Sequence, residues 1–319
     1  MATVTVNSQL TLVELAKRTL NNQIVDIAEV LSKVIQVLED AVWVECNKQE
    51  NHTFTQRLLL PTGSWRSLNA GVAGEASVTK QVTEGTGMLE TYSTIDAELV
   101  RLAGNSKKFR MSEDIAFVEG LMQTFGTALG YGNTGVNPEQ IDGWAVRYAT
   151  LGTMIKGASG TGSDTGSVWA VQWGENKCHM LYPQGSKIGM DLRDLGEQTV
   201  TDSDSNPYQA YRSYFQFHPG FAVHDNRCIG RVANIETAGA ANLFDPDKLI
   251  AIMNEMVERA AGAVLYCNST LMTQMDIQAM DKANVYYSVA DLFGVPTTHF
   301  RRLPIKQFDS LTITESAIT

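Results

Sequence analysis

Three groups of residues in this 319-residue chain are of types that could do chemistry, and the first is a glycine-rich stretch at 157–166. A P-loop needs a Lys followed by Ser or Thr after its last glycine, and this stretch has neither. A nucleophile elbow needs Gly-x-Ser-x-Gly, but Thr161 stands where the glycine after Ser159 should be. Because both phosphate binding and serine hydrolase chemistry lack their motif, we interpret the stretch as a flexible loop.

Histidines and cysteines, which could hold a metal ion, form the second group. No Cys-x-x-Cys or His-x-x-x-His pair occurs, so the familiar zinc spacings are missing. We interpret the histidines as strand residues satisfied by their neighbours, and the cysteines as free thiols in a reducing compartment. No metal and no cofactor is therefore predicted. The residues concerned are His52, His179, His218, His224, His299, Cys46, Cys178, Cys228 and Cys267.

Asp202 and Asp204 are the third group, because paired carboxylates can act as acid and base. They lie within 201–207, a run of turn-forming residues, so a solvated loop is the simpler interpretation. None of the three groups therefore carries a recognised catalytic motif.

The charge balance is acidic, with 35 Asp and Glu against 25 Lys and Arg and a net charge of -10. Such a chain has few cations to displace the counterions of a phosphate backbone, which excludes a dedicated nucleic-acid binder. We expect the short basic clusters at 107–110 and 301–302 to form ion pairs with an acidic neighbour. No signal-peptide pattern and no apolar run of about 18 residues occurs, so we expect cytosolic synthesis and no membrane contact.

Helical periodicity and capping residues predict four helical regions. An Asp-Pro pair is a strong helix start, because Asp caps and Pro suits the first helical position. The predicted helices lie at 11–38, as one long helix or as a pair broken or kinked at Asn21-Asn22, from Ser112 to Gly130 or Gly132 as one straight core helix, from Asp245 to about 260, and at 269–282.

The other segments are typical of strands, and two of them, 52–60 and 77–83, would form a long two-stranded arm. An isolated hairpin is marginal in water, and this one has few large apolar residues of its own. An outside surface must therefore brace it, and a symmetric assembly offers the same surface to every copy. We predict a self-assembling subunit. Further strands are predicted at 168–173, 178–182, 211–217, 284–289 and 304–313.

Short motifs along the chain carry a family resemblance through their order and spacing. Examples are His52-Thr-Phe-Thr and Trp65-Arg66-x-Leu68-Asn69 in the arm. The others lie at 60–62, 81–83, 86–90, 173–174, 182–186, 208–212, 231–235, 276–282 and 303–305. The chain resembles the major capsid proteins of tailed bacteriophages with the Hong Kong 97-like fold, and more closely the epsilon-fifteen type of short-tailed phages.

The resemblance implies an α+β fold with four parts. These are an N-arm at 1–44, an extended β-hairpin loop at 45–98, a peripheral domain with a long spine helix at 99–150, and a mostly axial domain at 151–319 with strands returning to the peripheral domain. It also implies contacts between subunits, for which we select Phe54, Leu60, Trp65, Arg66, Leu68 and Met88.

The implied function is that of a structural protein of the virion, assembled in the host cytoplasm. Its copies would form hexamers and pentamers of an icosahedral shell around double-stranded DNA, with portal, scaffolding or decoration proteins as partners. Some relatives crosslink a Lys of the extended loop, but nothing in the sequence around Lys80 predicts this chemistry. Two rival hypotheses are an encapsulin-like cellular nanocompartment and a cytosolic α/β enzyme using the 157–166 loop.

Overall fold

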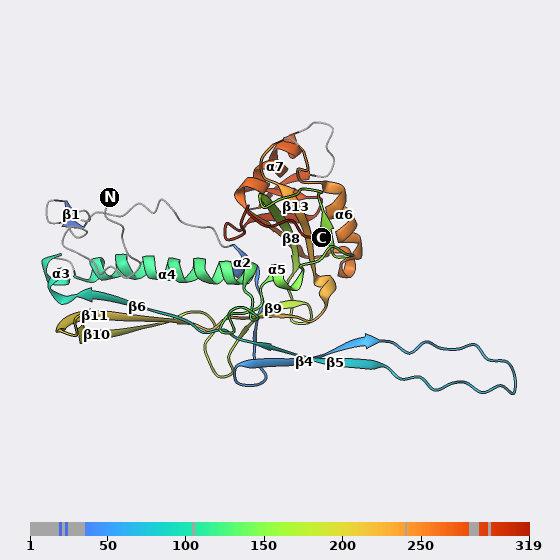
Figure 1. Cartoon of the computed structure of the whole chain (residues 1–319), viewed down its shortest axis with the longest axis horizontal. Coiled ribbons are helices and arrows are strands. Elements are labelled where there is room, and N and C mark those ends of the chain that lie inside the picture. Colours follow the sequence, from blue (N-terminus) through green and yellow to red (C-terminus); the bar gives the residue numbers. More distant parts are fainter. Residues whose placement is uncertain are drawn as a thin grey trace.

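The computed structural model describes residues 19–20, 23–24, 36–103, 106–239, 241–280, 287–292 and 295–319. Figure 1 shows an elongated molecule with a long helix, α4, lying along a narrow sheet at one end. An α/β body stands beside that helix, and a two-stranded arm reaches away from both.

The body is built on a seven-stranded sheet in the order β15-β16-β17-β14-β8-β13-β7. All of β8 is buried, and its alternating side chains enter two different cores. Trp169 and Val171 face one core, whereas Val168 and Ala170 face the other, so both faces of the sheet are covered. The strands are β7 (Ile155–Gly157), β8 (Thr165–Gln172), β13 (Ile229–Glu236), β14 (Ala263–Cys267), β15 (Tyr287–Leu292), β16 (Val295–Phe300) and β17 (Leu303–Gln307).

Two helices, α6 (Pro246–Glu255) and α7 (Ser269–Met280), contribute buried residues to the core on one face of this sheet. The predicted start of α6 is confirmed, because the carboxylate of Asp245 accepts a hydrogen bond from the backbone of Asp247 at 3.0 Å. Its apolar stripe, which includes Leu249 and Ile252, is buried against the sheet.

Helix α4 (Ser106–Tyr131) begins six residues before the predicted Ser112. Tertiary packing explains the difference, since Phe109 is fully buried with residues of α3 (Ala97–Leu102) and the end of β6 (Leu89–Asp96). The predicted end near Gly130 is confirmed. Although α4 has 26 residues, none of the helices described is both long and apolar enough to cross a membrane.

The prediction that α4 is buried along its whole stripe is wrong at its N-terminal half. Phe125 and Leu129 are buried in the core, but Ile115 is 50% exposed. This half of α4 extends beyond the body and lies along the three-stranded sheet β10-β11-β6 (Figure 1). The strands involved are β10 (Asp191–Thr201) and β11 (Pro207–Phe217), with β6.

A small sheet, β12-β9-β3, joins the body to the arm. It consists of β3 (Trp43–Glu45), β9 (Cys178–Tyr182) and β12 (Gly220–Val223). The predicted strands at 168–173 and 178–182 are confirmed, but they belong to different sheets.

The predicted helix at 11–38 is wrong at residues 19–20 and 23–24, and it is helical as predicted at residues 37–38. Strands β1 (Thr19–Leu20) and β2 (Gln23–Ile24) pair in antiparallel fashion on either side of Asn21-Asn22, a pair of turn-forming residues. Among the described residues of this region, those of α2 (Val37–Asp40) are helical, and the rest of the prediction falls outside the described residues. Asp40 accepts hydrogen bonds from Tyr266 at 2.7 Å and from Lys306 at 2.6 Å, which fixes α2 to the body.

Candidate functional site: the extended arm and its root

The extended arm comprises residues 51–85, with strand β4 (Asn51–Leu59), strand β5 (Val78–Gly85) and the connecting segment 60–77. The two strands pair in antiparallel fashion, as predicted. The connecting segment continues well past the body without regular secondary structure (Figure 1). The arm therefore projects with no core of its own at its tip.

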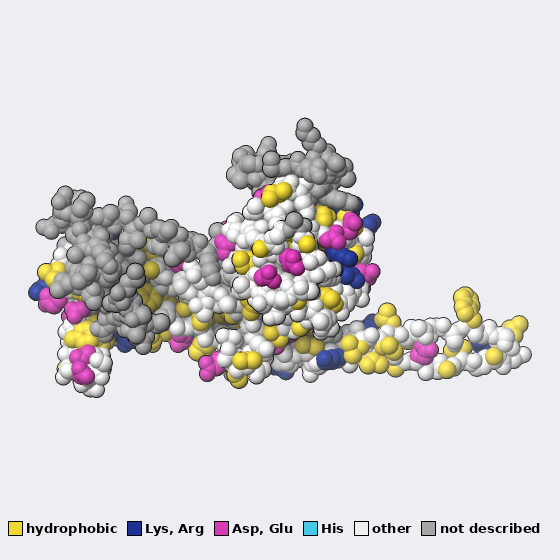
Figure 2. Space-filling view, turned by 45° about the horizontal axis from the view of Figure 1, so that its top comes forward, with side chains coloured by type: hydrophobic (Ala, Val, Ile, Leu, Met, Phe, Trp, Pro, Cys, Tyr) yellow, Lys and Arg dark blue, Asp and Glu magenta, His cyan; other side chains and the backbone are white. Residues whose placement is uncertain are grey.

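Large apolar side chains on the arm are uncovered, as Figure 2 shows along its length. Trp65 is fully exposed and Leu68 is 94% exposed. Each large apolar side chain of this kind gains about 1.5–3 kcal/mol when it is buried, and a monomer rarely leaves many of them in one exposed region. This surface needs a partner. Leu58, Leu59, Leu60, Val72 and Val78 are also exposed by about half or more.

Local hydrogen bonds give the tip of the arm a defined shape. The backbone N–H of Thr62 donates to the carboxylate of Glu75 across the two sides of the connecting segment. The guanidinium of Arg66 donates to the carbonyl of Ala70 at 3.0 Å and closes the end. Arg66 is thus used within the arm, while the neighbouring Trp65 remains free to contact another surface.

An ion pair fixes the root of the arm to the body. The carboxylate of Glu84 on β5 accepts two hydrogen bonds of 2.7 Å from Arg147, at the end of α5 (Trp144–Arg147). Burial alone would lower the pKa of Arg147, but Glu84 outweighs it and raises the pKa. The guanidinium also lies over the ring of Phe221, 5.7 Å from its centre. Two elements distant in sequence are joined by this bidentate contact.

The root is also joined to β12 through the backbone. Gly87 donates to the carbonyl of Pro219 at 2.8 Å, and Thr86 bridges to Gly220. A Cβ atom at Gly220 would lie 2.9 Å from side-chain atoms of both Leu181 and Thr86, so only glycine permits this close approach. On the other strand, Gln56 donates to the carbonyl of His224 at 2.8 Å.

Most of the residues predicted to contact other subunits are exposed. Leu60, Trp65, Arg66 and Leu68 lie on the connecting segment, and Met88 lies just after the arm with 57% exposure. Phe54 is different, because it is 8% exposed and stacks on His224 with ring centres 4.0 Å apart. Its packing is within its own chain.

An apolar groove between α4 and β10 was not foreseen from the sequence. It has a volume of about 510 Å³, and exposed Met111, Ile115 and Leu192 line it. The apolar stripe along α4 could have indicated this groove, because the stripe is longer than the part of α4 that the body covers. At its rim Arg110 pairs with Asp194 at 2.5 Å, so the expectation that this basic cluster pairs with a neighbour is wrong for Arg110.

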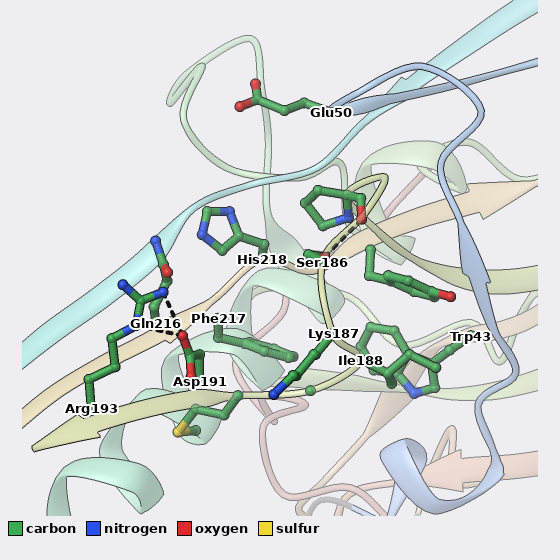
Figure 3. A pocket seen from close by; sticks show the side chains of 14 residues that line it. Trp43, Glu50, Ser186, Lys187, Ile188, Asp191, Arg193, Gln216, Phe217 and His218 are labelled. Atoms are coloured by element: carbon green, nitrogen blue, oxygen red, sulfur yellow. Dashed lines mark hydrogen bonds and ion pairs between the residues drawn. The ribbon is translucent and has the colours of Figure 1, made fainter.

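A pocket of about 410 Å³ lies between the loop 183–190 and residues at the end of β11 (Figure 3). It contains Ser186 and His218, but the Ser186 hydroxyl donates to the carbonyl of Pro183 at 2.8 Å. Asp191 is paired with Arg193 at 2.7 Å. These lining residues, all within the described chain, do not combine an activated nucleophile with a base, and the pocket has no recognisable catalytic arrangement.

The other candidate residues from the sequence lie apart from this pocket. Asp202 caps the turn between β10 and β11 by accepting from the backbone of Asp204 at 2.9 Å, as the loop interpretation predicted. In the 157–166 loop, Gly160 donates to the carbonyl of Asn234 at 2.9 Å. All four cysteines are free and buried.

A buried ion pair, also missed from the sequence, connects the C-terminal segment to the body. Arg231 on β13 and Glu315 lie 2.9 Å apart, with side chains only 4% and 6% exposed. Arg231 also donates to Ser167 at 3.0 Å, and the hydroxyl of Tyr131 at the end of α4 donates to Glu315 at 2.5 Å. The network joins β13, β8 and α4 to the last residues of the chain.

Comparisons with known proteins agree with this architecture. A family model described as "Major capsid protein GP7" matches residues 19–319. A chain in the near-atomic structure of bacteriophage Epsilon15 is similar over 100% of both chains, with 28% identity and a TM-score of 0.73. A chain of the bacteriophage JBD30 capsid shares the fold, with 10% identity and a TM-score of 0.53 over 88% of this chain and 92% of that one. No curated protein matches.

The family match covers nearly the whole chain and includes the arm, the long helix and the body. The α+β architecture is that of the Hong Kong 97-like capsid fold. A shell-forming fold explains why apolar side chains on the arm are exposed. It also agrees with the lack of a catalytic arrangement among the described residues. The chain belongs to the major capsid protein GP7 family, as a structural component of the head shell of a tailed phage and not an enzyme.

Proposed function

We propose that copies of this major capsid protein form hexamers and pentamers of an icosahedral shell, in which the extended arm of each subunit lies across a neighbour. The observation that carries this proposal is the row of apolar side chains on the arm that the described residues leave exposed. The ion pair and backbone contacts at the root hold the arm away from its own body. That row is therefore available for burial against another molecule.

Within this proposal the chain divides into an N-arm at 1–44, the extended loop at 45–98, a peripheral domain at 99–150 and a mostly axial domain at 151–319. The seven-stranded sheet with α6 and α7 supports the axial assignment by having its own core. Strands β10 and β11, which pair with β6 below α4, are the strands that return to the peripheral domain.

The contact residues of the proposal are Leu60, Trp65, Arg66, Leu68 and Met88. Trp65 is the central one, because it is the largest of the exposed apolar side chains and lies near the tip. Aromatic residues and Arg dominate the binding energy of many protein interfaces. Phe54 is left out, since it is already buried beside His224.

The shell of the proposal encloses double-stranded DNA without binding it tightly. The net charge of -10 supports this, since an acidic chain does not retain a polyanion that is being packed. A portal through which the DNA enters, and scaffolding or decoration proteins, complete the assembly in the proposal.

Trp65→Asp tests the role of the arm. We expect soluble, folded subunits but at least about a tenfold lower yield of closed shells, because burying an unpaired carboxylate at a contact is costly. Electron microscopy and light scattering measure the yield, and circular dichroism checks the fold.

Two matched variants serve as controls for this experiment. Trp65→Phe keeps an aromatic ring and should still form shells, and Val136→Asp adds the same charge at another site that is 72% exposed. Normal shell yields from Trp65→Asp would refute the placement of Trp65 at a subunit contact.

A further inference from the structure

Three histidines that are far apart in sequence meet at the root of the arm. His52 is on β4, His179 is on β9, and His224 directly follows β12. One ring nitrogen from each lies within 4.8 Å of the others. The ring centres are 5.0 Å apart for His179 and His224, and 5.5 Å apart for His52 and His179.

These rings lack the hydrogen bonds that buried histidines normally make. His179 is completely buried, and neither of its nitrogens makes a hydrogen bond of good geometry with a described residue, although the backbone at Gly174 and Glu175 interacts weakly with it. Nδ1 of His52 and Nε2 of His224 are also buried and unpartnered there. Leaving one such polar group unsatisfied costs about 1–3 kcal/mol, so four unpartnered nitrogens in one place require an explanation.

The surroundings keep the imidazoles neutral near pH 7. Burial lowers the pKa of all three, and for His179 burial with the neighbouring His224 and His52 lowers the pKa to about 4. A weaker favourable interaction with the backbone at Gly174 and Glu175 offsets only part of that change. A neutral imidazole has a free lone pair, which is the form that binds metals.

We infer that His52, His179 and His224 bind a divalent transition-metal ion of the zinc class and thereby tie the extended arm to the body. Three imidazole ligands with one open position are a recurrent zinc arrangement. No carboxylate or thiol of the described residues belongs to the cluster, which disfavours Ca²⁺ and Mg²⁺.

The geometry can close around an ion with small side-chain rotations. Zinc–nitrogen bonds of 2.0–2.1 Å place tetrahedral ligand atoms about 3.3 Å apart, so the nitrogens must approach one another. His52 and His224 are only half-buried and can turn toward His179. Their exposed sides also give solvent access, through which the ion enters and a water completes the coordination.

A bound ion would connect separate parts of the fold, because its three ligands come from three separate elements. The arm contributes His52, and the small sheet contributes His179 and the residue after β12. A bound ion would add a crosslink beside the Glu84–Arg147 pair and narrow the range of arm orientations. The site lies within one chain, so its existence does not depend on the proposed role of the arm in assembly.

Titration of the metal-free full chain with Co²⁺ tests the site. We expect one Co²⁺ to bind per chain and to show the visible absorption of four- or five-coordinate Co²⁺. Added Zn²⁺ should displace the bound Co²⁺ and abolish this absorption. Mutation of residues that merely hydrogen-bond to metal ligands typically weakens metal affinity about 10- to 100-fold. Loss of a ligand itself should cost more, so His52→Gln and His224→Gln should each weaken binding by at least about 100-fold. His218→Gln is the control and should bind as the wild type does.

His179→Gln completes the set, and circular dichroism checks that each variant folds. Because His52 and His224 are half-buried, their variants keep the test valid even if His179→Gln does not fold. Absence of stoichiometric binding to the wild-type chain would overturn the inference. So would unchanged affinity in both His52→Gln and His224→Gln.

Hydrogen exchange tests the tie between arm and body. Zn²⁺ should slow exchange at β4 and β9 in the wild-type chain but not in His52→Gln. If Zn²⁺ binds yet leaves exchange at β4 unchanged, the ion is bound but does not fix the arm, and that part of the inference is wrong.

Discussion

At the level of single residues, the buried ion pair between Arg231 and Glu315 controls where the C-terminal segment lies. Both side chains are almost fully buried, and hydrogen bonds from Ser167 and Tyr131 satisfy the remaining carboxylate positions. A buried pair gains little over an apolar pair, but removing one partner leaves the other charge stranded in the interior. Because Arg231 is costly to leave unpaired in the interior, the pair holds the C-terminal segment in place against the body.

We predict that Glu315→Ala lowers the free energy of unfolding by about 3–5 kcal/mol, because Arg231 would remain buried and unpaired. Urea unfolding of unassembled subunits measures this change. Asp191→Ala, which removes a pair with side chains 49% and 59% exposed, is the control and should cost at most about 1 kcal/mol. Equal losses in the two variants would contradict the special role of the buried pair.

The histidine cluster gives the metal-free protein a pH dependence. Burial lowers the pKa of His179 to about 4 in the folded chain, against an ordinary value of 6.5. Between these pH values the unfolded chain binds more protons at this side chain than the folded chain does. The free energy of unfolding therefore has its full value above pH 6.5 and falls as the pH drops toward 4. His179 can account for roughly 3 kcal/mol of this loss at most.

Unfolding of metal-free subunits between pH 7 and pH 4 measures this dependence, with His179→Gln as the comparison. The variant should lose stability less steeply over that interval, since its side chain does not titrate. An identical slope in both proteins would show that the cluster does not control the acid response.

At the scale of elements, the arm depends on a few root contacts for its direction. The strands of the arm are bonded mainly to each other, and their contacts with the body include those of Glu84 and Gln56, the bridge at Gly220 and the buried ring of Phe54. Removing one of these contacts should loosen the arm without unfolding the body, which has two cores of its own.

Glu84→Gln tests this dependence, because it leaves the largely buried Arg147 without its carboxylate. We expect about a tenfold increase in backbone hydrogen exchange at β5, corresponding to about 1.4 kcal/mol, with β8 unchanged. Glu98→Gln removes an exposed pair on α3 and should leave β5 as in the wild type. Unchanged exchange at β5 in Glu84→Gln would mean that the ion pair does not hold the arm.

At the scale of the whole molecule, assembly brings many like-charged subunits together. Each chain carries a net charge of -10, and the repulsion between copies opposes the burial of apolar arm residues. The balance of these two terms depends on salt, because the Debye length falls from about 10 Å at 0.1 M to about 3 Å at 1 M.

We predict that shell formation increases with NaCl concentration over this range, as followed by light scattering. Trp65→Asp is the comparison, since screening cannot restore the lost apolar contact and its assembly should remain low. Dissociation of wild-type shells at high salt would contradict the prediction and would indicate that ion pairs between subunits dominate the interfaces.

Some elements could be predicted from local residues because local chemistry decides them. The start of α6 follows from Asp245-Pro246, and the hairpin of the arm follows from two β-prone runs. The start of α4 could not be located, because the burial of Phe109 against α3, not a capping residue, extends the helix. The predicted helix near Asn21 failed because periodicity alone cannot recognise a short strand pair.

Residue types and their order along the chain were enough to identify the family and the hairpin arm and to show that the sequence contains no catalytic motif. Which side chains meet depends instead on how the folded elements pack. His52 is separated by more than a hundred residues from both His179 and His224, as Phe54 is from His224, and Arg147 is 63 residues from Glu84. Such contacts arise when strands from different sheets pack together, and no local pattern encodes that packing.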